Sequence, residues 1–275
     1  MSELIVCGWD EVFVLEIGQT KDGTQRKVWS WKASDRNELP DYMRTRFGTT
    51  DECKPIDGGK RILITSSGGG AALIERETGS VVFYASVPNA HSADLLPGDR
   101  VAVAASHAPG GDRLIVYDLS TPDKELISEE LSWGHGVVWD ETRQVLWALS
   151  DTKLWTYHLE YWYTSNPSLA TVEAIDLPDV SGHDLIPVGD TAFLAVSTEK
   201  HCWLFDRDRM IFSPLPRLAN EKDVKSISIH PDTDQLVYVR ADPGEWWSET
   251  ILTLNPDSDL QFPGEHIYKV RWNVV

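Results

Sequence analysis

The chain has 275 residues, of which 43 are Asp or Glu and 25 are Lys or Arg, so its formal net charge at pH 7 is −18. A surface this acidic repels nucleic acid and anionic membranes, which excludes both as expected partners. Hydrophobic residues make up 41% of the chain, enough for a continuous core, and no apolar run approaches the length of a membrane span.

The N-terminal residues 1–7 have neither the basic region nor the long apolar segment of a signal peptide. The three cysteines, Cys7, Cys53 and Cys202, are far apart and form no CxxC pair, which argues against a disulfide framework and against a thiolate zinc site. We therefore expect a cytoplasmic protein.

Almost the whole chain reads as short strands, rich in Val, Ile, Leu, Trp and Tyr and separated by Gly, Pro, Asp and Asn. Three strands, at 3–8, 11–17 and 27–33, come before a polar connection in which residues 39–44 make one helical turn. From residue 54 onward the strands group in fours. The expected four-stranded units cover 54–86, 91–131, 135–177, 184–214 and 225–262.

A basic or imidazole side chain stands at the head of an apolar run six times, and we call these residues the anchors. They are separated by 37, 44, 48, 42 and 44 positions: Lys54, His91, His135, His183, Lys225 and Lys269. A loose period of this size is typical of four-stranded propeller blades. Only one strand remains after the fifth unit. This C-terminal strand needs the three N-terminal strands to complete a sixth blade.

The sequence therefore predicts an all-β protein, a six-bladed β-propeller that forms one domain over residues 1–275. Its sixth blade combines residues 3–33 with residues 267–275, which closes the ring and removes exposed sheet edges.

Inner strands line the axis of a propeller, so the six anchors should form a ring there. Neutral His91, His135 and His183 could hold one divalent metal ion, such as Mn, Zn or Ca, with a position left open for water or substrate. Alternatively, they could bind an anion directly together with the lysines. The simplest alternative is that the anchors only tie blades together around a water-filled channel.

Lys225 and Lys269 stand within apolar strands, where an unpaired lysine is costly. Each needs an anionic ligand or a carboxylate, for which the candidates are Asp10, Asp51, Glu52 and Asp223. A lysine close to like charges would have a lowered pKa and could act as a base. Carboxylates could also orient the histidine rings, and the candidates for that role are Asp94, Glu52 and Asp184.

The loops between the second and third strands of each blade share a face with the entry to the inner strands. This face gathers glycines, hydroxyl groups and aromatic rings, so we predict that it binds the ligand. Its aromatic rings could stack on a sugar or simply pack, and its arginines could reach a ligand carboxylate or lie in solvent. The substrate-binding candidates are Lys54, Lys269, Arg44, Arg46, Trp9, Trp246, His107 and His201, and the catalytic candidates are His91, His135, His183 and Lys225.

Five segments resemble an uncharacterised group of bacterial and fungal six-bladed propellers: residues 7–10, 51–54, 89–94, 134–140 and 182–185. More distantly, the chain is similar to propeller polysaccharide lyases of the oligogalacturonate type, which keep histidines and a metal near the axis. No catalytic motif of theirs can be aligned residue by residue, so the link is an analogy of fold.

This resemblance implies a carbohydrate-active enzyme that acts on an acidic sugar by β-elimination. The ligand would be an anionic small molecule or oligosaccharide. Two alternatives stay open: a non-catalytic propeller that binds a small molecule or peptide, and a metal-dependent hydrolase or lactonase.

Overall fold

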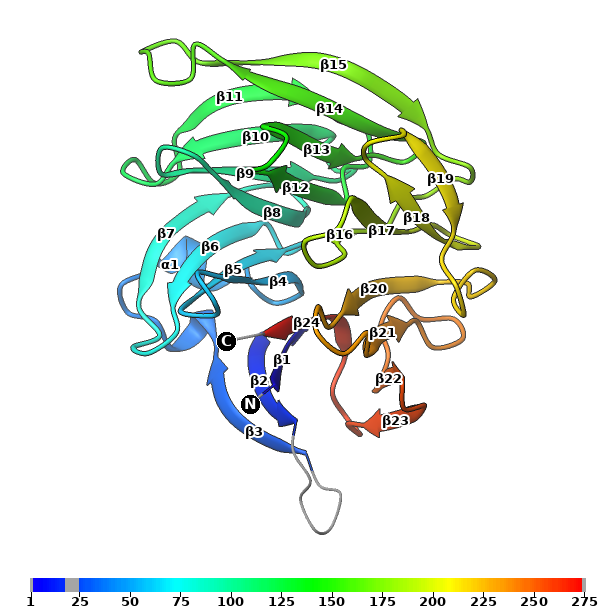
Figure 1. Cartoon of the computed structure of the whole chain (residues 1–275). Coiled ribbons are helices and arrows are strands. Elements are labelled where there is room, and N and C mark those ends of the chain that lie inside the picture. The colour runs from blue at the N-terminus through cyan, green and yellow to red at the C-terminus, as the bar shows by residue number, and fades with distance from the viewer. Residues whose placement is uncertain (1, 18–24, 274–275) are drawn as a thin grey trace.

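Six antiparallel sheets of four strands each stand around a common centre, as Figure 1 shows for the computed structural model of the chain. The structure describes residues 2–17 and 25–273. The ranges expected for the sixth blade therefore include residues 18–24 and 274–275, which lie outside the described residues. The prediction of an all-β, six-bladed propeller is confirmed.

Each blade runs from an inner strand beside the axis to an outer strand at the rim. The first three blades are β4 (Thr50–Ile56), β5 (Arg61–Ser66), β6 (Gly70–Glu75) and β7 (Val81–Ser86); β8 (Ala90–Leu96), β9 (Arg100–Ala105), β10 (Arg113–Asp118) and β11 (Glu125–Glu130); and β12 (Gly136–Asp140), β13 (Val145–Leu149), β14 (Lys153–Glu160) and β15 (Ser168–Asp176).

The next two blades are β16 (Asp184–Pro187), β17 (Phe193–Ser197), β18 (Cys202–Asp206) and β19 (Ile211–Pro214), and β20 (Val224–Ile229), β21 (Leu236–Arg240), β22 (Thr250–Leu254) and β23 (Ser258–Gln261). The last is β24 (Ile267–Asn273), β1 (Ser2–Gly8), β2 (Glu11–Ile17) and β3 (Arg26–Trp31). Two short helices, η1 (Ala33–Asp35) and α1 (Asp41–Arg44), lie in the polar connection. No described helix is both long and apolar enough to span a membrane.

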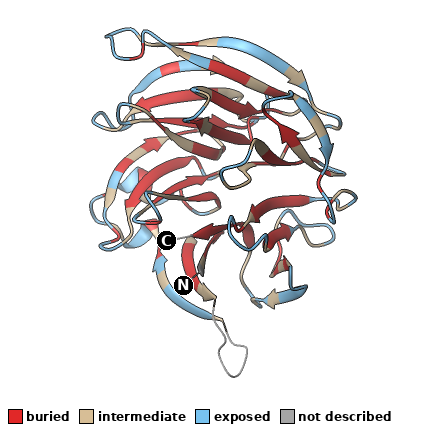
Figure 2. Cartoon of the chain, in the orientation of Figure 1, coloured by how far each residue is buried: buried red, intermediate tan, exposed pale blue. Residues whose placement is uncertain are grey.

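The core lies between adjacent blades. Second strands such as β5 and β9 are buried along nearly their whole length, because neighbouring blades cover both of their faces. Outer strands such as β15 are largely exposed, and Figure 2 shows burial concentrated toward the centre of the ring. The continuous apolar runs of the second strands thus follow from their position in the blade.

The ring is closed by the two ends of the chain. β24 pairs antiparallel with β1, so that Val6 lies opposite Val270 and Leu4 opposite Trp272. The other edge of β1 pairs with β2, and neither edge of β1 is left open. The predicted combination of one C-terminal strand with three N-terminal strands is therefore what the sheet shows.

Gly8 lies where this closure brings two backbones into close approach. A Cβ atom on Gly8 would stand 1.8 Å from the carbonyl oxygen of His266, which belongs to the backbone and cannot move aside cheaply. We expect Gly8→Ala to lower the free energy of unfolding by about 1–3 kcal/mol, measured by urea denaturation. Gly48→Ala is the matched control, because no atom of the described residues lies within 4 Å of its Cβ position. Equal unfolding midpoints for the two variants would contradict this close approach.

Inner strands of neighbouring blades are tied to each other by side chains. The Ser92 hydroxyl accepts a hydrogen bond from the Val137 N–H at 3.3 Å, which joins the second blade to the third. The Ser226 hydroxyl does the same for the Val270 N–H at 3.0 Å, between the fifth and the sixth. Polar side chains near the axis therefore satisfy backbone groups that have no partner in their own sheet.

Candidate functional site: the axial cavity

All six inner strands begin on the same face of the ring, and the residue at each entry occupies an equivalent position. In four strands it is the extra residue of a β-bulge, left without a cross-strand partner. In the other two it immediately precedes β12 or β16 and donates its backbone N–H to the neighbouring strand at 2.9 Å. Bulges re-aim side chains at sites of this kind. We call the six residues the mouth ring: Asp51, His91, His135, His183, Lys225 and Tyr268.

The mouth ring differs from the expected ring of anchors in two blades. Lys54 lies three residues beyond Asp51, and Lys269 lies one residue beyond Tyr268. The structure therefore brings four of the six anchors together at the mouth and places Lys54 and Lys269 in the buried layers below it.

The mouth ring opens into a cavity of about 270 Å³. Its wall is completed by Ser67, Asn89 and Trp246. Larger hollows occur elsewhere, such as one of about 810 Å³ beside residues 220–223 and 240–245, but its lining includes no histidine. The axial cavity gathers imidazole, amine, carboxyl and phenol groups in one place, which that larger hollow does not.

His91 and His135 are oriented in the same way. The Nδ1 atom of His91 lies 3.0 Å from the carbonyl oxygen of Asn89, and that of His135 lies 2.8 Å from the carbonyl oxygen of Trp133. These contacts require Nδ1–H, so in the neutral rings Nε2 carries the free lone pair. Asn89 and Trp133 both have left-handed φ angles, of 49° and 50°. A costly backbone conformation thus recurs where it orients a histidine.

The histidines are held neutral by their surroundings. The ring centroids of His91 and His135 are 4.3 Å apart, and those of His135 and His183 are 5.4 Å apart. Burial lowers the pKa of His91 to about 4, and the charges of Lys269 and Lys225 act in the same direction. Burial also lowers the pKa values of His135 and His183 well below the ordinary value.

Asp51 is the acidic member of the mouth ring. Its carboxyl group accepts a hydrogen bond from the Ser67 N–H and stands 3.8 Å from Nε2 of His91. Burial raises its pKa to about 7, although the hydrogen bond from Ser67 opposes that shift. A carboxyl group that titrates near neutrality beside a neutral imidazole is suited to proton transfer.

Lys225 and His183 form a pair on another part of the ring. The Nζ atom of Lys225 lies 3.1 Å from Nε2 of His183, and no carboxylate in the described part of the chain pairs with that amine. Burial lowers the pKa of Lys225. The expected partner Asp223 influences this lysine only through its charge.

An aromatic wall rises from the mouth ring toward solvent. The rings of Tyr268 and Trp246 meet edge to face at 5.7 Å, and those of Trp246 and Trp9 stack at 5.5 Å. Tyr268 is buried, whereas Trp246 and Trp9 are 38% and 41% exposed. The two indoles that the sequence singled out thus extend from the cavity to the surface, where a flat ligand could stack on them.

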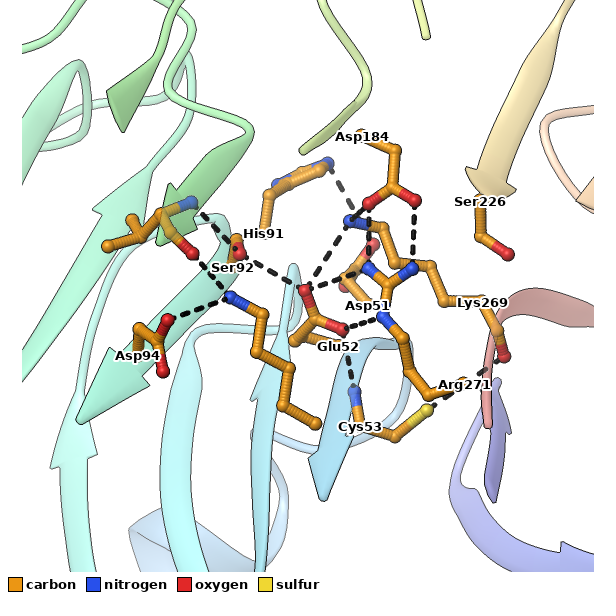
Figure 3. A network of polar contacts seen from close by, with 12 residues as sticks. Asp51, Glu52, Cys53, His91, Ser92, Asp94, Asp184, Ser226, Lys269 and Arg271 are labelled. Atoms are coloured by element: carbon orange, nitrogen blue, oxygen red, sulfur yellow. Dashed lines mark hydrogen bonds and ion pairs between the residues drawn. The ribbon is translucent and has the colours of Figure 1, made fainter. Parts of the chain in front are cut away.

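A buried ionic layer closes the axis below the mouth ring. Arg271 lies between two carboxylates, with its Nε 2.9 Å from Glu52 Oε1 and its NH2 2.6 Å from Asp184 Oδ1. Lys269 lies 3.0 Å from Asp184 and 3.7 Å from Glu52 (Figure 3). All four side chains are at most 1% exposed. Glu52 and Asp184 therefore neutralise buried cations rather than orient the histidines.

Electrostatics of this layer favour the ionised forms of its two carboxyl groups. Burial alone would raise the pKa of Glu52, but the charges of Arg271, Lys269 and Lys54 outweigh it and lower that pKa to about 2. Burial would also raise the pKa of Asp184, but the charges of Arg271 and Lys269 outweigh it and lower that pKa. Lys54 lies 3.6 Å from Asp94 and donates to the carbonyl oxygen of Val137. Lys54 and Lys269 are thus satisfied within the protein.

Four other residues expected to bind the ligand lie outside the cavity lining. Arg44 pairs with Asp41 on its own helix, and Arg46 packs against the Gly69 loop. His107 stacks on Trp133 at 4.7 Å and pairs with Asp112 at 2.8 Å, and His201 pairs with Asp179 at 3.1 Å. The structure does not bring any of the four to the mouth ring.

The predicted metal site does not fit the present arrangement of the histidines. In residues 2–17 and 25–273, no group of three or more His, Cys, Asp or Glu side chains is placed to hold a metal ion. The Nε2 atom of His183 already faces the Lys225 amine at 3.1 Å. We therefore derive no step through a metal, and elemental analysis of the purified protein remains the test of that prediction.

Acid should destabilise the protein through the neutral histidines. His91 titrates at its ordinary value of 6.5 when unfolded and near 4 in the fold. Because the folded pKa is the lower one, the unfolded chain takes up the proton first, and stability is lost as pH falls from 6.5 toward 4. At 1.36 kcal/mol per pKa unit, His91 alone accounts for about 3 kcal/mol of this loss.

Asp51 acts in the opposite direction. Its folded pKa is about 7 against 3.8 ordinarily, so its contribution is present at low pH and is lost as pH rises through this range. We expect His91→Asn to flatten the loss of stability in acid and Asp51→Asn to steepen it. Urea unfolding at a series of pH values between 4 and 7 measures both slopes. Parallel curves for both variants and the wild type would show that neither group has a shifted pKa.

Taken together, the six closed sheets and the axial cavity define the class of protein: a six-bladed β-propeller with a ligand-sized site at one end of its axis. The chain belongs to the family described as "Family of unknown function (DUF6528)", which matches residues 15–275.

The fold has a counterpart among solved structures. A chain in the structure described as "Crystal structure of Nidogen/Laminin Complex" is 12% identical, with a TM-score of 0.66 over 100% of this chain and 99% of that one. At this identity the likeness shows the fold alone. No curated protein matches the chain. The distant similarity to polysaccharide lyases is not shown by any of these comparisons.

Proposed function

We propose that this protein is a carbohydrate-active enzyme that binds an acidic sugar in its axial cavity and carries out a β-elimination. One observation carries the proposal: the mouth ring brings a carboxyl group, three imidazoles and an amine into one cavity, those of Asp51, His91, His135, His183 and Lys225. Groups with strongly shifted pKa values in a cleft are typical of active sites.

Each wall of the cavity has a part in this reaction. Tyr268 and Trp246 offer aromatic faces to a sugar ring, and Lys225 is an amine that pairs with no carboxylate of the described residues. Elimination requires a base that removes the proton next to the sugar carboxylate. Asp51, with a pKa of about 7 and His91 at 3.8 Å, is the group best matched to that task at neutral pH.

Oligosaccharides of uronic acids test the proposal directly. We expect the protein to release products with a carbon–carbon double bond conjugated to the carboxylate, followed by ultraviolet absorbance and mass spectrometry. Neutral oligosaccharides of the same length are the matched control. If no uronate is turned over while uronates still raise the melting temperature, the protein is the non-catalytic binding propeller instead.

That second candidate has its own support. Trp9 and Trp246 are exposed beside the cavity, as in a site that captures a flat ligand by stacking. Loss of the uronate-induced thermal shift in Trp246→Ala, with no product in either protein, is the result that favours binding alone. The hydrolase or lactonase alternative depends on a bound metal. Absence of a divalent metal in elemental analysis of the purified protein would exclude it.

A further inference from the structure

We propose that Lys225 forms an imine with a carbonyl-bearing acid, a keto acid or aldehydo acid, in the axial cavity. The inference rests on the proposed function in one respect, the acidic ligand, and adds to it a covalent role for one amine. It is argued from the surroundings of that amine.

Lys225 differs from the two other lysines of the inner strands. Lys54 and Lys269 each have a carboxylate within 4 Å, at 3.6 Å and 3.0 Å. Lys225 has none among the described residues, and its amine faces the cavity wall beside the ring nitrogen of His183 at 3.1 Å. A buried ammonium without a counter-ion is costly, so this environment favours the neutral amine, which is the nucleophilic form.

His183 supports the same protonation state. Its Nδ1 atom is buried and finds no hydrogen-bond partner within residues 2–17 and 25–273. If Nδ1 carried the proton, a buried donor would be left unsatisfied, at a cost of about 1–3 kcal/mol. With the proton on Nε2, Nδ1 carries only an unpaired acceptor lone pair, and Nε2–H donates to Lys225 Nζ. An amine can accept that hydrogen bond only when it is neutral.

The step balances without any further reactant. The lone pair of Lys225 Nζ attacks the carbonyl carbon, a C–N bond forms, and the carbonyl oxygen takes up a proton to give a carbinolamine. The hydroxyl group then leaves as water, so that both amine protons end on the departing water and a C=N bond remains. Asp51 lines the same cavity, and its pKa of about 7 leaves a fraction of its carboxyl group protonated at neutral pH. It is the acid that can protonate the departing hydroxyl.

Protonation of the imine restores a positive charge at Nζ. That charge lies next to the ligand carboxylate and withdraws electrons from the adjacent C–H bond, which makes the proton easier to remove. Open-chain sugar acids carry both the carbonyl and the carboxylate that this arrangement requires.

Reductive trapping tests the inference. The protein is incubated at neutral pH with glyoxylate and sodium cyanoborohydride, which converts an imine into a stable secondary amine. We expect one adduct per chain, located on Lys225 by fragmentation of its peptide. Because the neutral amine is the reactive form, Lys225 should be labelled faster and to a higher extent than exposed Lys222.

Two variants keep the test sharp. Lys225→Arg keeps a long nitrogen-bearing side chain but cannot form the imine, and it should lose the adduct. Lys222→Arg, on the surface, should keep it. Adducts spread over surface lysines with Lys225 unmodified would overturn the inference. Trapping at Lys225 without turnover of any uronate would instead count against the proposed reaction and leave the imine standing.

Discussion

Arg271→Met should be the most destabilising single substitution considered, with an expected loss of about 3–5 kcal/mol in the free energy of unfolding. The guanidinium of Arg271 holds Glu52 and Asp184 together from opposite blades, and all three are buried. Its removal leaves more negative than positive charge in a layer that water does not reach. Urea denaturation measures the loss.

Arg209→Met provides the control for this prediction. That side chain is 77% exposed and pairs with Asp206 only at 3.8 Å, so its loss should stay within about 0.5 kcal/mol. If Arg271→Met were as stable as Arg209→Met, the ionic layer would contribute nothing to holding the ring together.

Asp51→Asn should reduce turnover of the uronate substrate by about 10²–10⁴-fold, the range expected when a general base is removed. Asparagine keeps the shape of the side chain and its contact with the Ser67 N–H, but it cannot accept the proton. The readout is the initial rate of formation of the unsaturated product under saturating substrate.

Asp112→Asn is the matched control for activity. Asp112 lies on the same face and pairs with His107, but it does not line the cavity. It should leave turnover within about twofold of the wild type, since it touches none of the groups to which proton transfer is assigned. Comparable rates for Asp51→Asn and the wild type would mean that another group takes the proton.

The architecture could be predicted from the sequence because it depends on short-range patterns. Turn residues mark the strand ends, and the strand count leaves one strand at the C-terminus and three at the N-terminus. Closure then follows because an open blade would expose sheet edges.

The position of each inner-strand residue relative to the cavity could not be predicted from the chemistry of its side chain. Lys54 and Lys269 resemble Lys225 in chemistry, but the bulges place Asp51 and Tyr268 at the equivalent positions. A usable signal was present two residues further on. Each mouth-ring residue is followed at that spacing by a buried apolar residue: Cys53, Ala93, Val137, Leu185, Ile227 and Val270. Alternation along the strand aligns the blades better than charge does.

The ionic layer could not be predicted because its partners are far apart in sequence. Glu52 and Arg271 are 219 positions apart, and Asp184 and Arg271 are 87 apart. Nothing local distinguishes these carboxylates from surface acids until the ring closes. For the same reason, the pairing of Lys225 with a histidine rather than with Asp223 was open before the structure.

The position of β24 has a consequence for biosynthesis. This strand is translated after all the others, yet it supplies the edge on which β1 pairs and the two cations, Lys269 and Arg271, that Glu52 and Asp184 require. Until it emerges, a nascent chain with five formed blades carries two buried carboxylates without these cations and an open edge on β1. Completion of the circle, rather than assembly of any single blade, is then the step at which an elongating chain is most exposed to misassociation.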